Sequence, residues 1–249
     1  MIKFFRRIRK RLLNDNKFSK YLLYAVGEII LVVIGILIAL QVNNWNDARL
    51  ERNKEQEYLI EIKQNLEKDT TNINQAIAFY QRKAILVNET FGLFGLGSEG
   101  KPYIDQLLPK MDTLTSFEVY IPVRTAFDNM VAAETVDLIQ NKALRTALST
   151  YYSQLDYKSG TQERAKEASR QFTDEISPKM MSRELIQLYL GQNVAYPALK
   201  DISIHSDPMV ASKLFTLYMN ATILIKELEQ QKAEIETILN QIDPMVSDP

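Results

Sequence analysis

The stretch from Tyr21 to Asn46, YLLYAVGEIILVVIGILIALQVNNWN, constrains the fold of this chain more than any other feature. No charged residue occurs from Ile29 to Val42. Tyr24 and Trp45 lie 21 positions apart, which corresponds to about 30 Å of helix, the thickness of a hydrocarbon core. Aromatic rings at both ends suit the interfacial belts of a membrane. We therefore predict a transmembrane helix over residues 21–45 rather than a buried core helix.

A basic arm precedes this stretch. Residues 1–20 hold eight Lys or Arg residues and one Asp, whereas the rest of the chain has 22 basic and 30 acidic groups. Such an arm could bind nucleic acid, but cations directly before an apolar span are typical of a cytoplasmic flank. We predict no nucleic-acid partner and a lipid bilayer instead. The predicted interface anchors are Arg6, Arg7, Arg9, Lys10, Arg11, Lys17, Lys20, Tyr21, Tyr24 and Trp45.

The apolar stretch lacks the features of a cleaved signal peptide. A cleavage site needs small residues two positions apart after the apolar region, and IALQVNNW offers only Ala39 before Gln41 and Val42. An uncleaved signal anchor fits better. The positive-inside rule then places the N-terminus in the cytoplasm and residues 46–249 on the extracytoplasmic side of an inner membrane.

Glu28 is the acidic residue of the span and has two interpretations. One turn above Tyr24, it lies near the inner boundary, where a carboxylate can reach the interface or a lysine of the arm. It could equally be a polar contact to another helix. Gly27, Gly35 and Ala39 share one stripe with it, and small residues allow close helix approach in lipid. We predict a helix contact through Gly27, Glu28, Gly35 and Ala39, either between identical chains or with another membrane or envelope protein.

Residues 16–46, NKFSKYLLYAVGEIILVVIGILIALQVNNWN, resemble the start of an uncharacterised bacterial family of single-pass membrane proteins of the Bacteroidota type. That family has a basic arm, a Y-A-[IV]-G-E span, a G-I-L-I-A-L core and an N-N-W-N exit. Residues 125–152, TAFDNMVAAETVDLIQNKALRTALSTYY, resemble its internal pattern. Met130 and Glu134 replace a usual leucine and glycine, which disfavours a tight turn there. The resemblance implies a membrane anchor with a helical extracytoplasmic domain, and implies no activity.

Helical periodicity dominates the rest of the chain, so the predicted fold class is mainly α, a helical bundle with long antiparallel helices. We expect helices over 46–87, 103–111, 123–136, 142–176 and 178–190, with Gly160 interrupting the fourth, and loops at 92–102, 117–122 and 191–207. Asn141 is the predicted N-cap of the fourth helix. The first and fourth helices have these apolar stripes: Leu59, Ile62, Leu66, Ile73, Ile77, Tyr80, Ala84, Val87; and Leu144, Leu148, Tyr151, Leu155, Ala165, Phe172, Ile176.

The last helix has the clearest pattern. Ser206 and Asp207 before Pro208 predict a capped start. A heptad seam follows, with one polar member, Gln231. Packing within the chain is favoured over a coiled coil with another copy. The seam comprises Val210, Leu214, Leu217, Ala221, Leu224, Leu228, Gln231, Ile235, Ile238 and Ile242.

The sequence offers little for catalysis or cofactor binding. It contains no Cys and a single histidine, His205, whose neighbours Ser206 and Asp207 are better explained as helix caps. GLGSEG at 95–100 matches G-x-G-x-x-G but lacks the strand that a dinucleotide site requires. We therefore expect no catalytic residue, metal or cofactor.

Three classes of function stay open. The first is an anchored extracytoplasmic helical module that binds a partner, scaffolds an assembly or senses a ligand. The second is an accessory subunit of a larger membrane complex held through its span. The third, which no catalytic constellation supports, is an enzyme at the membrane surface.

Overall fold

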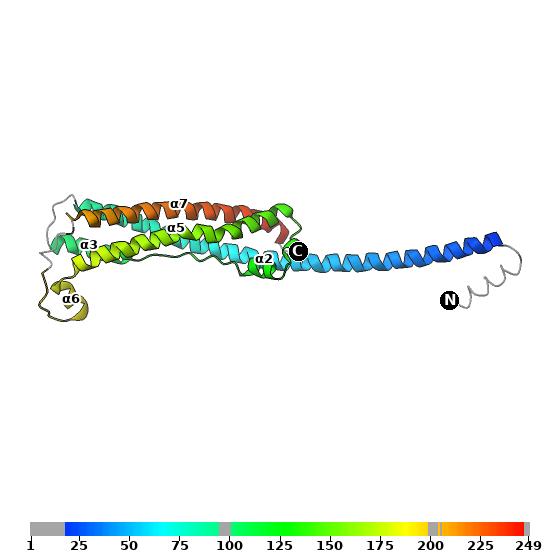
Figure 1. Ribbon diagram of the computed structural model, residues 1–249, viewed down its shortest axis with the longest axis horizontal. Helices are drawn as coiled ribbons and strands as arrows, with labels where there is room; N and C mark the ends of the chain where they lie inside the picture. Colours follow the sequence, from blue (N-terminus) through cyan, green and yellow to red (C-terminus); the bar gives the residue numbers. More distant parts are fainter. Residues whose placement is uncertain (1–17, 95–100, 199–203, 205, 247–249) are drawn as a thin grey trace. The chain divides into compact units, whose positions relative to one another are not determined.

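All secondary structure described is helical in the computed structural model, which describes residues 18–94, 101–198, 204 and 206–246 (Figure 1). This confirms the mainly α fold class. The elements are α2 (Phe18–Phe94), α3 (Lys101–Thr115), α4 (Thr125–Ala132), the 3-10 helix η1 (Val136–Leu138), α5 (Lys142–Met180), α6 (Arg183–Leu190) and α7 (Pro208–Val246). The chain divides into two compact units, residues 1–55 and 56–249.

The second unit is built on three long helices: residues 56–94 of α2, α5 and α7, which lie side by side (Figure 1). α7 runs antiparallel to α2, because Lys63 pairs with Asp243 at 2.8 Å near one end while Val87 and Val210 share an apolar cluster towards the other. α7 is also antiparallel to α5, as shown by the contacts Lys158–Glu234 at 2.6 Å and Lys213–Gln171 at 2.9 Å.

The predicted seam of α7 is confirmed. All ten seam residues are buried, including Gln231. Within the bundle the nine apolar seam residues join the buried stripes of α2 and α5 in two apolar clusters. The seam is therefore used within the chain, as expected, because its regular spacing of three and four keeps one face of a long helix continuously buried.

The stripes of α2 and α5 are also confirmed, with one change on α2. Every predicted stripe residue is buried except Ala84, which is half-buried, while its neighbour Lys83 is buried instead. Asp69 fills the gap between Leu66 and Ile73 on the same face. The apolar stripe of α2 therefore contains two ionisable residues that the sequence analysis did not place in the core.

Some predicted helix boundaries were wrong. α5 runs unbroken through Gly160, because the roughly 1 kcal/mol cost of a helical glycine is small beside the packing of a 39-residue helix on α7. α5 also includes Pro178, so the helix predicted from there begins only at Arg183. α2 continues to Phe94, and α4 ends at Ala132.

The helix caps agree with the sequence. The Asn141 side chain accepts hydrogen bonds from the Ala143 and Leu144 N–H groups at 3.0 and 3.2 Å. Asp207 does the same for Met209 and Val210 at 2.8 and 3.4 Å. These carboxylate and amide oxygens satisfy N–H groups that have no partner within a helix.

The tight turn after α4 forms despite its glutamate. Glu134 has a φ of 55°, in the left-handed region, and its N–H bonds to Val131 O at 3.1 Å. The Thr135 N–H reaches back to Met130 O at 2.9 Å. This pair of bonds is a Schellman ending, which normally carries glycine. The turn that the Glu134 replacement disfavoured is therefore present, at the cost of strain.

Residues 116–124 link α3 to α4 in the irregular conformation predicted around 117–122. We call this segment the strap. It runs along the three-helix core (Figure 1).

Candidate functional site

The apolar segment of α2 is the first candidate site. Every residue from Val26 to Asp47 is exposed, including Gly27, Glu28, Gly35 and Ala39, and Trp45 is 61% exposed. α2 is long and apolar enough from Ala25 onward to cross a membrane, with none of its most apolar window buried; a signal sequence would share this property. α7 meets the same criterion of length and composition, although part of its window is buried in the core.

The predicted interface anchors are described only in part. Arg6, Arg7, Arg9, Lys10, Arg11 and Lys17 lie outside the described residues. Lys20, Tyr21 and Tyr24 belong to α2, but their side chains are not among those described. Trp45 is exposed, and its role as an interface anchor stays a prediction.

The strap is the second candidate, because buried polar side chains hold its backbone. Tyr80 donates to Glu118 O at 2.7 Å, and Lys83 donates to Ser116 O. Gln162 of α5 brackets Tyr120, accepting from its N–H at 2.8 Å and donating to its carbonyl at 3.1 Å. Backbone groups that would otherwise be unpaired inside the bundle are thus satisfied by side chains.

Asp69 anchors the far end of the strap. Its Oδ1 accepts the Val123 N–H at 2.8 Å, while Oδ2 is buried with no hydrogen bond recorded in the described part of the chain. Burial raises the pKa of Asp69 to about 6, and the Val123 N–H, the Tyr120 hydroxyl and Lys68 act in the opposite direction. Desolvation outweighs these favourable contacts, so Asp69 binds its proton more tightly in the folded chain than in the unfolded chain.

Buried polar groups continue from Asp69 into the core. Gln231 Nε2 of α7 lies 3.5 Å from the Tyr120 hydroxyl and 3.4 Å from the Tyr151 hydroxyl. Burial raises the pKa of Tyr120 and brings that of Tyr151 to about 12, so both stay protonated and can donate. The ring of Tyr152 stacks on Phe127 at 4.6 Å. This cluster joins α2, the strap, α5 and α7 through polar groups, which specify one register of packing.

Lys83 and Ser169 form a pair of side chains of the kind that some enzymes use as a nucleophile and its base. Lys83 Nζ donates to Ser169 Oγ at 2.6 Å, and burial lowers the pKa of Lys83 to about 7. A neutral lysine beside a serine hydroxyl is the arrangement of a serine–lysine nucleophile. Here both side chains are fully buried, the strap accepts from Lys83, and Ser169 donates to Ala165 O at 3.1 Å. The Lys83–Ser169 pair therefore links α2, α5 and the strap through buried hydrogen bonds.

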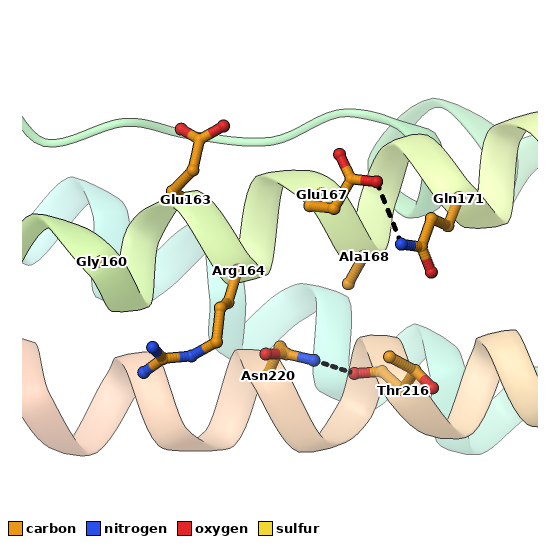
Figure 2. A pocket seen from close by; sticks show the side chains of 8 residues that line it. All are labelled: Gly160, Glu163, Arg164, Glu167, Ala168, Gln171, Thr216 and Asn220. Carbon is orange, nitrogen blue, oxygen red and sulfur yellow. Dashed lines mark hydrogen bonds between the residues drawn. The ribbon is translucent and has the colours of Figure 1, made fainter.

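A shallow groove runs between α5 and α7 on the surface (Figure 2). We call it the α5–α7 groove. Its volume is about 530 Å³. Gln171 Nε2 donates a hydrogen bond to Glu167 Oε1 at 3.0 Å, and Asn220 donates to Thr216 O at 2.9 Å. Arg164 reaches from α5 towards α7 (Figure 2). The lining residues are Gly160, Glu163, Arg164, Glu167, Ala168, Gln171, Thr216 and Asn220.

Comparison with known proteins identifies the family. Residues 28–172 match the DUF6090 family, described as a family of unknown function. The chain belongs to the DUF6090 family. No curated protein and no solved structure matches the chain significantly.

The sequence match to DUF6090 includes residues of both units of the chain. It begins at Glu28 inside the apolar segment and ends at Phe172 on α5. The matched region contains Asp69, Lys83, the strap and the α5 side of the groove, whereas α7 lies beyond it. The match covers more than half of the chain, and the description of the family gives no activity.

In this DUF6090 chain, sequence reasoning missed Asp69, Lys83 and Ser169. A signal was present for all three. Asp69 continues the spacing of Ile62, Leu66 and Ile73, and Lys83 falls between Tyr80 and Val87 at intervals of three and four. Ser169 falls in the same way between Ala165 and Phe172. A polar residue in register with a stripe marks a buried position.

The alternative chemical sites have no support in the described residues. Among them, no group of three or more acidic or histidine side chains is placed to hold a metal ion. His205 and the GLGSEG segment at 95–100 lie outside the described part of the chain.

Proposed function

We propose that this chain is a non-enzymatic, single-pass inner-membrane protein whose extracytoplasmic helical domain binds a partner and so scaffolds or senses at the membrane. The exposed segment Ile29–Val42 carries this proposal. An uncharged surface of that length would promote aggregation in water, whereas lipid would cover it. The basic arm before it and the aromatic Trp45 after it favour a span with the N-terminus in the cytoplasm.

Partner binding is favoured over catalysis by the surface of the second unit. Its buried Lys83–Ser169 pair is closed by the strap, so a substrate would have to displace the strap to reach it. By contrast, the α5–α7 groove and the exposed apolar residues of α7 are already accessible. Accessible apolar surface of this kind marks protein–protein contact sites.

Topology is tested with a pair of reporters fused after Pro249. A reporter enzyme that is active only outside the cytoplasm should be active, and a reporter that fluoresces only in the cytoplasm should be dark. The mass of the membrane-extracted chain should include residues 1–20, which separates an anchor from a cleaved signal. The reverse reporter pattern, or a processed chain, would overturn the proposed topology.

A second candidate is an accessory subunit of a larger membrane complex. The observation that favours it is the open face of α2 at Gly27 and Gly35, where an added Cβ would meet nothing within 4 Å. Glu28 and Ala39 extend this face, and a second transmembrane helix could approach it closely. The partner would then be held mainly through the span.

Substitutions within the span test this candidate. Gly35→Leu should lower recovery of co-purified partners in mild detergent, because bulk there pushes helix backbones apart. Glu28→Gln should weaken association modestly, since interhelical polar contacts contribute about 0.6 kcal/mol. Val33→Leu, on another face of the helix, is the matched control. If all three variants recover the same partners as the unmodified chain, the span is a plain anchor.

A further inference from the structure

An apolar ridge lies on the outer face of α7 in the second unit. Phe215, Met219 and Ile223 follow one another at intervals of four and are 58%, 40% and 46% exposed. We call these three residues the α7 ridge. Beyond Lys226 the same outer face becomes polar, with residues such as Glu229, Gln230 and Thr237. The apolar exposure is therefore confined to the first half of the helix.

The ridge lies beside the α5–α7 groove. Thr216 and Asn220 of α7 line the groove, and each is one position from a ridge residue, Phe215 or Met219. Ridge and groove thus run along the same stretch of α7, with Thr216 next to the ridge residue Phe215 in sequence and on the edge of the groove. A protruding strip and a hollow strip on one face can complement each other if that face meets a copy of itself.

We infer that a second copy of this chain docks on this face, with the α7 ridge of each copy packed into the α5–α7 groove of the other and the two bundles parallel. This inference rests on the proposed membrane anchoring and names the partner of the extracytoplasmic domain. It uses a surface distinct from the buried seam of α7.

Symmetry selects the parallel arrangement. A two-fold axis parallel to the helices brings the ridge side of one face against the groove side of the other. A two-fold axis across the helices would instead place ridge against ridge and groove against groove. Two chains anchored in one bilayer by the same N-terminal segment share the same side of the membrane, so a two-fold axis that relates them lies along the membrane normal.

Charge supports the same register. The contacts Lys158–Glu234 and Lys213–Gln171 fix the heights of α5 and α7 relative to each other. Interpolating between them at 1.5 Å per residue places Glu163 at roughly the height of Lys226. Both side chains are exposed, and Lys226 continues the line of the ridge while Glu163 belongs to the groove lining. In a parallel pair, Lys226 of one copy therefore reaches Glu163 of the other.

The size of this contact suits a membrane-confined pair. Residues 209–226 span about 25 Å of helix, and a face two helices wide gives roughly 1,000 Å² of total buried surface. That is at the low end for a specific interface. Confinement to one membrane raises the effective concentration of the copies, so a modest contact suffices.

Disulfide cross-linking of the full chain in native membranes tests the arrangement directly, because the sequence contains no cysteine. Thr216→Cys lies at the border of ridge and groove, so it should face its own copy and cross-link on mild oxidation. Co-expressed Met219→Cys and Glu167→Cys chains with different tags should cross-link to each other more than Met219→Cys does to itself. Arg82→Cys, exposed on α2, is the control and should stay monomeric.

A charge exchange supplies the second test. Lys226→Glu should reduce the Thr216→Cys cross-link several-fold, and adding Glu163→Lys should restore it. No cross-link at Thr216→Cys, cross-linking equal to the Arg82→Cys control, or a Thr216→Cys adduct made only with a different protein would each overturn the inference. Failure of restoration by Glu163→Lys would overturn the parallel register.

The outcomes separate this inference from the proposed function. If the reporters confirm the topology while Thr216→Cys stays monomeric, the anchor stands and the self-association fails. If the reporters reverse, the membrane proposal fails on its own measurement, whatever the cross-linking shows.

Discussion

Asp69 places a carboxylate on the apolar stripe of α2, where burial works against its charge. The residue is fully buried, and its pKa is raised to about 6, above the 3.8 of an ordinary aspartate. The folded chain therefore holds the proton more tightly than the unfolded chain. Its contribution to the free energy of unfolding is highest at low pH, falls as the pH rises from about 4 to about 6, and is constant above that.

Asp69→Asn should remove this pH dependence. The amide keeps an oxygen for the Val123 N–H but carries no charge, so the variant should be more stable than the unmodified chain above pH 6, by up to about 3 kcal/mol. Between pH 4.5 and pH 8, the thermal midpoint of the variant should exceed that of the unmodified chain by an amount that grows with rising pH. Glu57→Gln, at an exposed position of α2, is the control. A difference in midpoint that is constant or shrinks with rising pH would contradict the raised pKa of Asp69.

Glu134 shows strain at a single backbone position. A non-glycine residue with a φ of 55° crowds its own Cβ against the backbone, which costs about 1 kcal/mol. Glu134→Gly should therefore raise the thermal midpoint by roughly 2 °C. Glu134→Ala keeps the Cβ and should bring no gain. If the alanine variant stabilises as much as the glycine variant, the effect comes from removing the charge rather than from the backbone.

At the scale of elements, the α7 seam carries the packing of the second unit. Leu224 lies in its middle, 1% exposed, within the larger apolar cluster. The seam spacing was readable from the sequence, because a helix repeats its faces every three or four residues whatever it packs against. The apolar ridge on the opposite side of α7 was not predicted from the sequence. A second strip of apolar residues raises the overall hydrophobicity of a helix, and this does not show which of the two strips is buried.

Leu224→Asp should lower the free energy of unfolding by several kcal/mol, because it places an unpaired charge in the core. Ile60→Asp introduces the same charge at a position of α2 that is 44% exposed, and should change stability little. Thermal unfolding followed by circular dichroism compares the two. Equal midpoints for both variants and the unmodified chain would mean that the seam does not hold the bundle together.

At the scale of the whole molecule, the two compact units differ in what covers their apolar surface. The second unit buries its stripes in its own clusters, whereas the exposed apolar segment belongs to the first unit. A helical bundle with its own core of this size should fold without the exposed apolar segment.

Deletion of residues 1–47 should therefore give a soluble, helical protein whose thermal midpoint lies within a few degrees of that of the full chain in detergent. Sedimentation and circular dichroism would measure both properties. An aggregated or unfolded product would show that the bundle depends on residues 1–47. The deletion also lowers the effective concentration of copies, so this product should be more monomeric than the full chain in membranes.

Local pattern predicted the helices, their caps and most buried faces. The spacing of apolar residues, Asn141 before α5 and Asp207 before α7 act through neighbours within a few positions, so no long-range information was needed. The boundaries at Gly160 and Pro178 were wrong because tertiary packing on α7 outweighs the local preference of either residue.

The sequence by itself determined the apolar segment, the helical class and the seam, since each depends on composition and period along the chain. Only the tertiary structure decided the partners of the buried residues Asp69, Lys83 and Ser169: the strap bonds to Asp69 and Lys83, and Lys83 bonds to Ser169. Those contacts join residues 33 to 86 positions apart, such as Lys83 with Ser116 and with Ser169. The register of a polar residue with an apolar stripe can indicate its burial, but the distant groups that become its hydrogen-bond partners are set only by the fold.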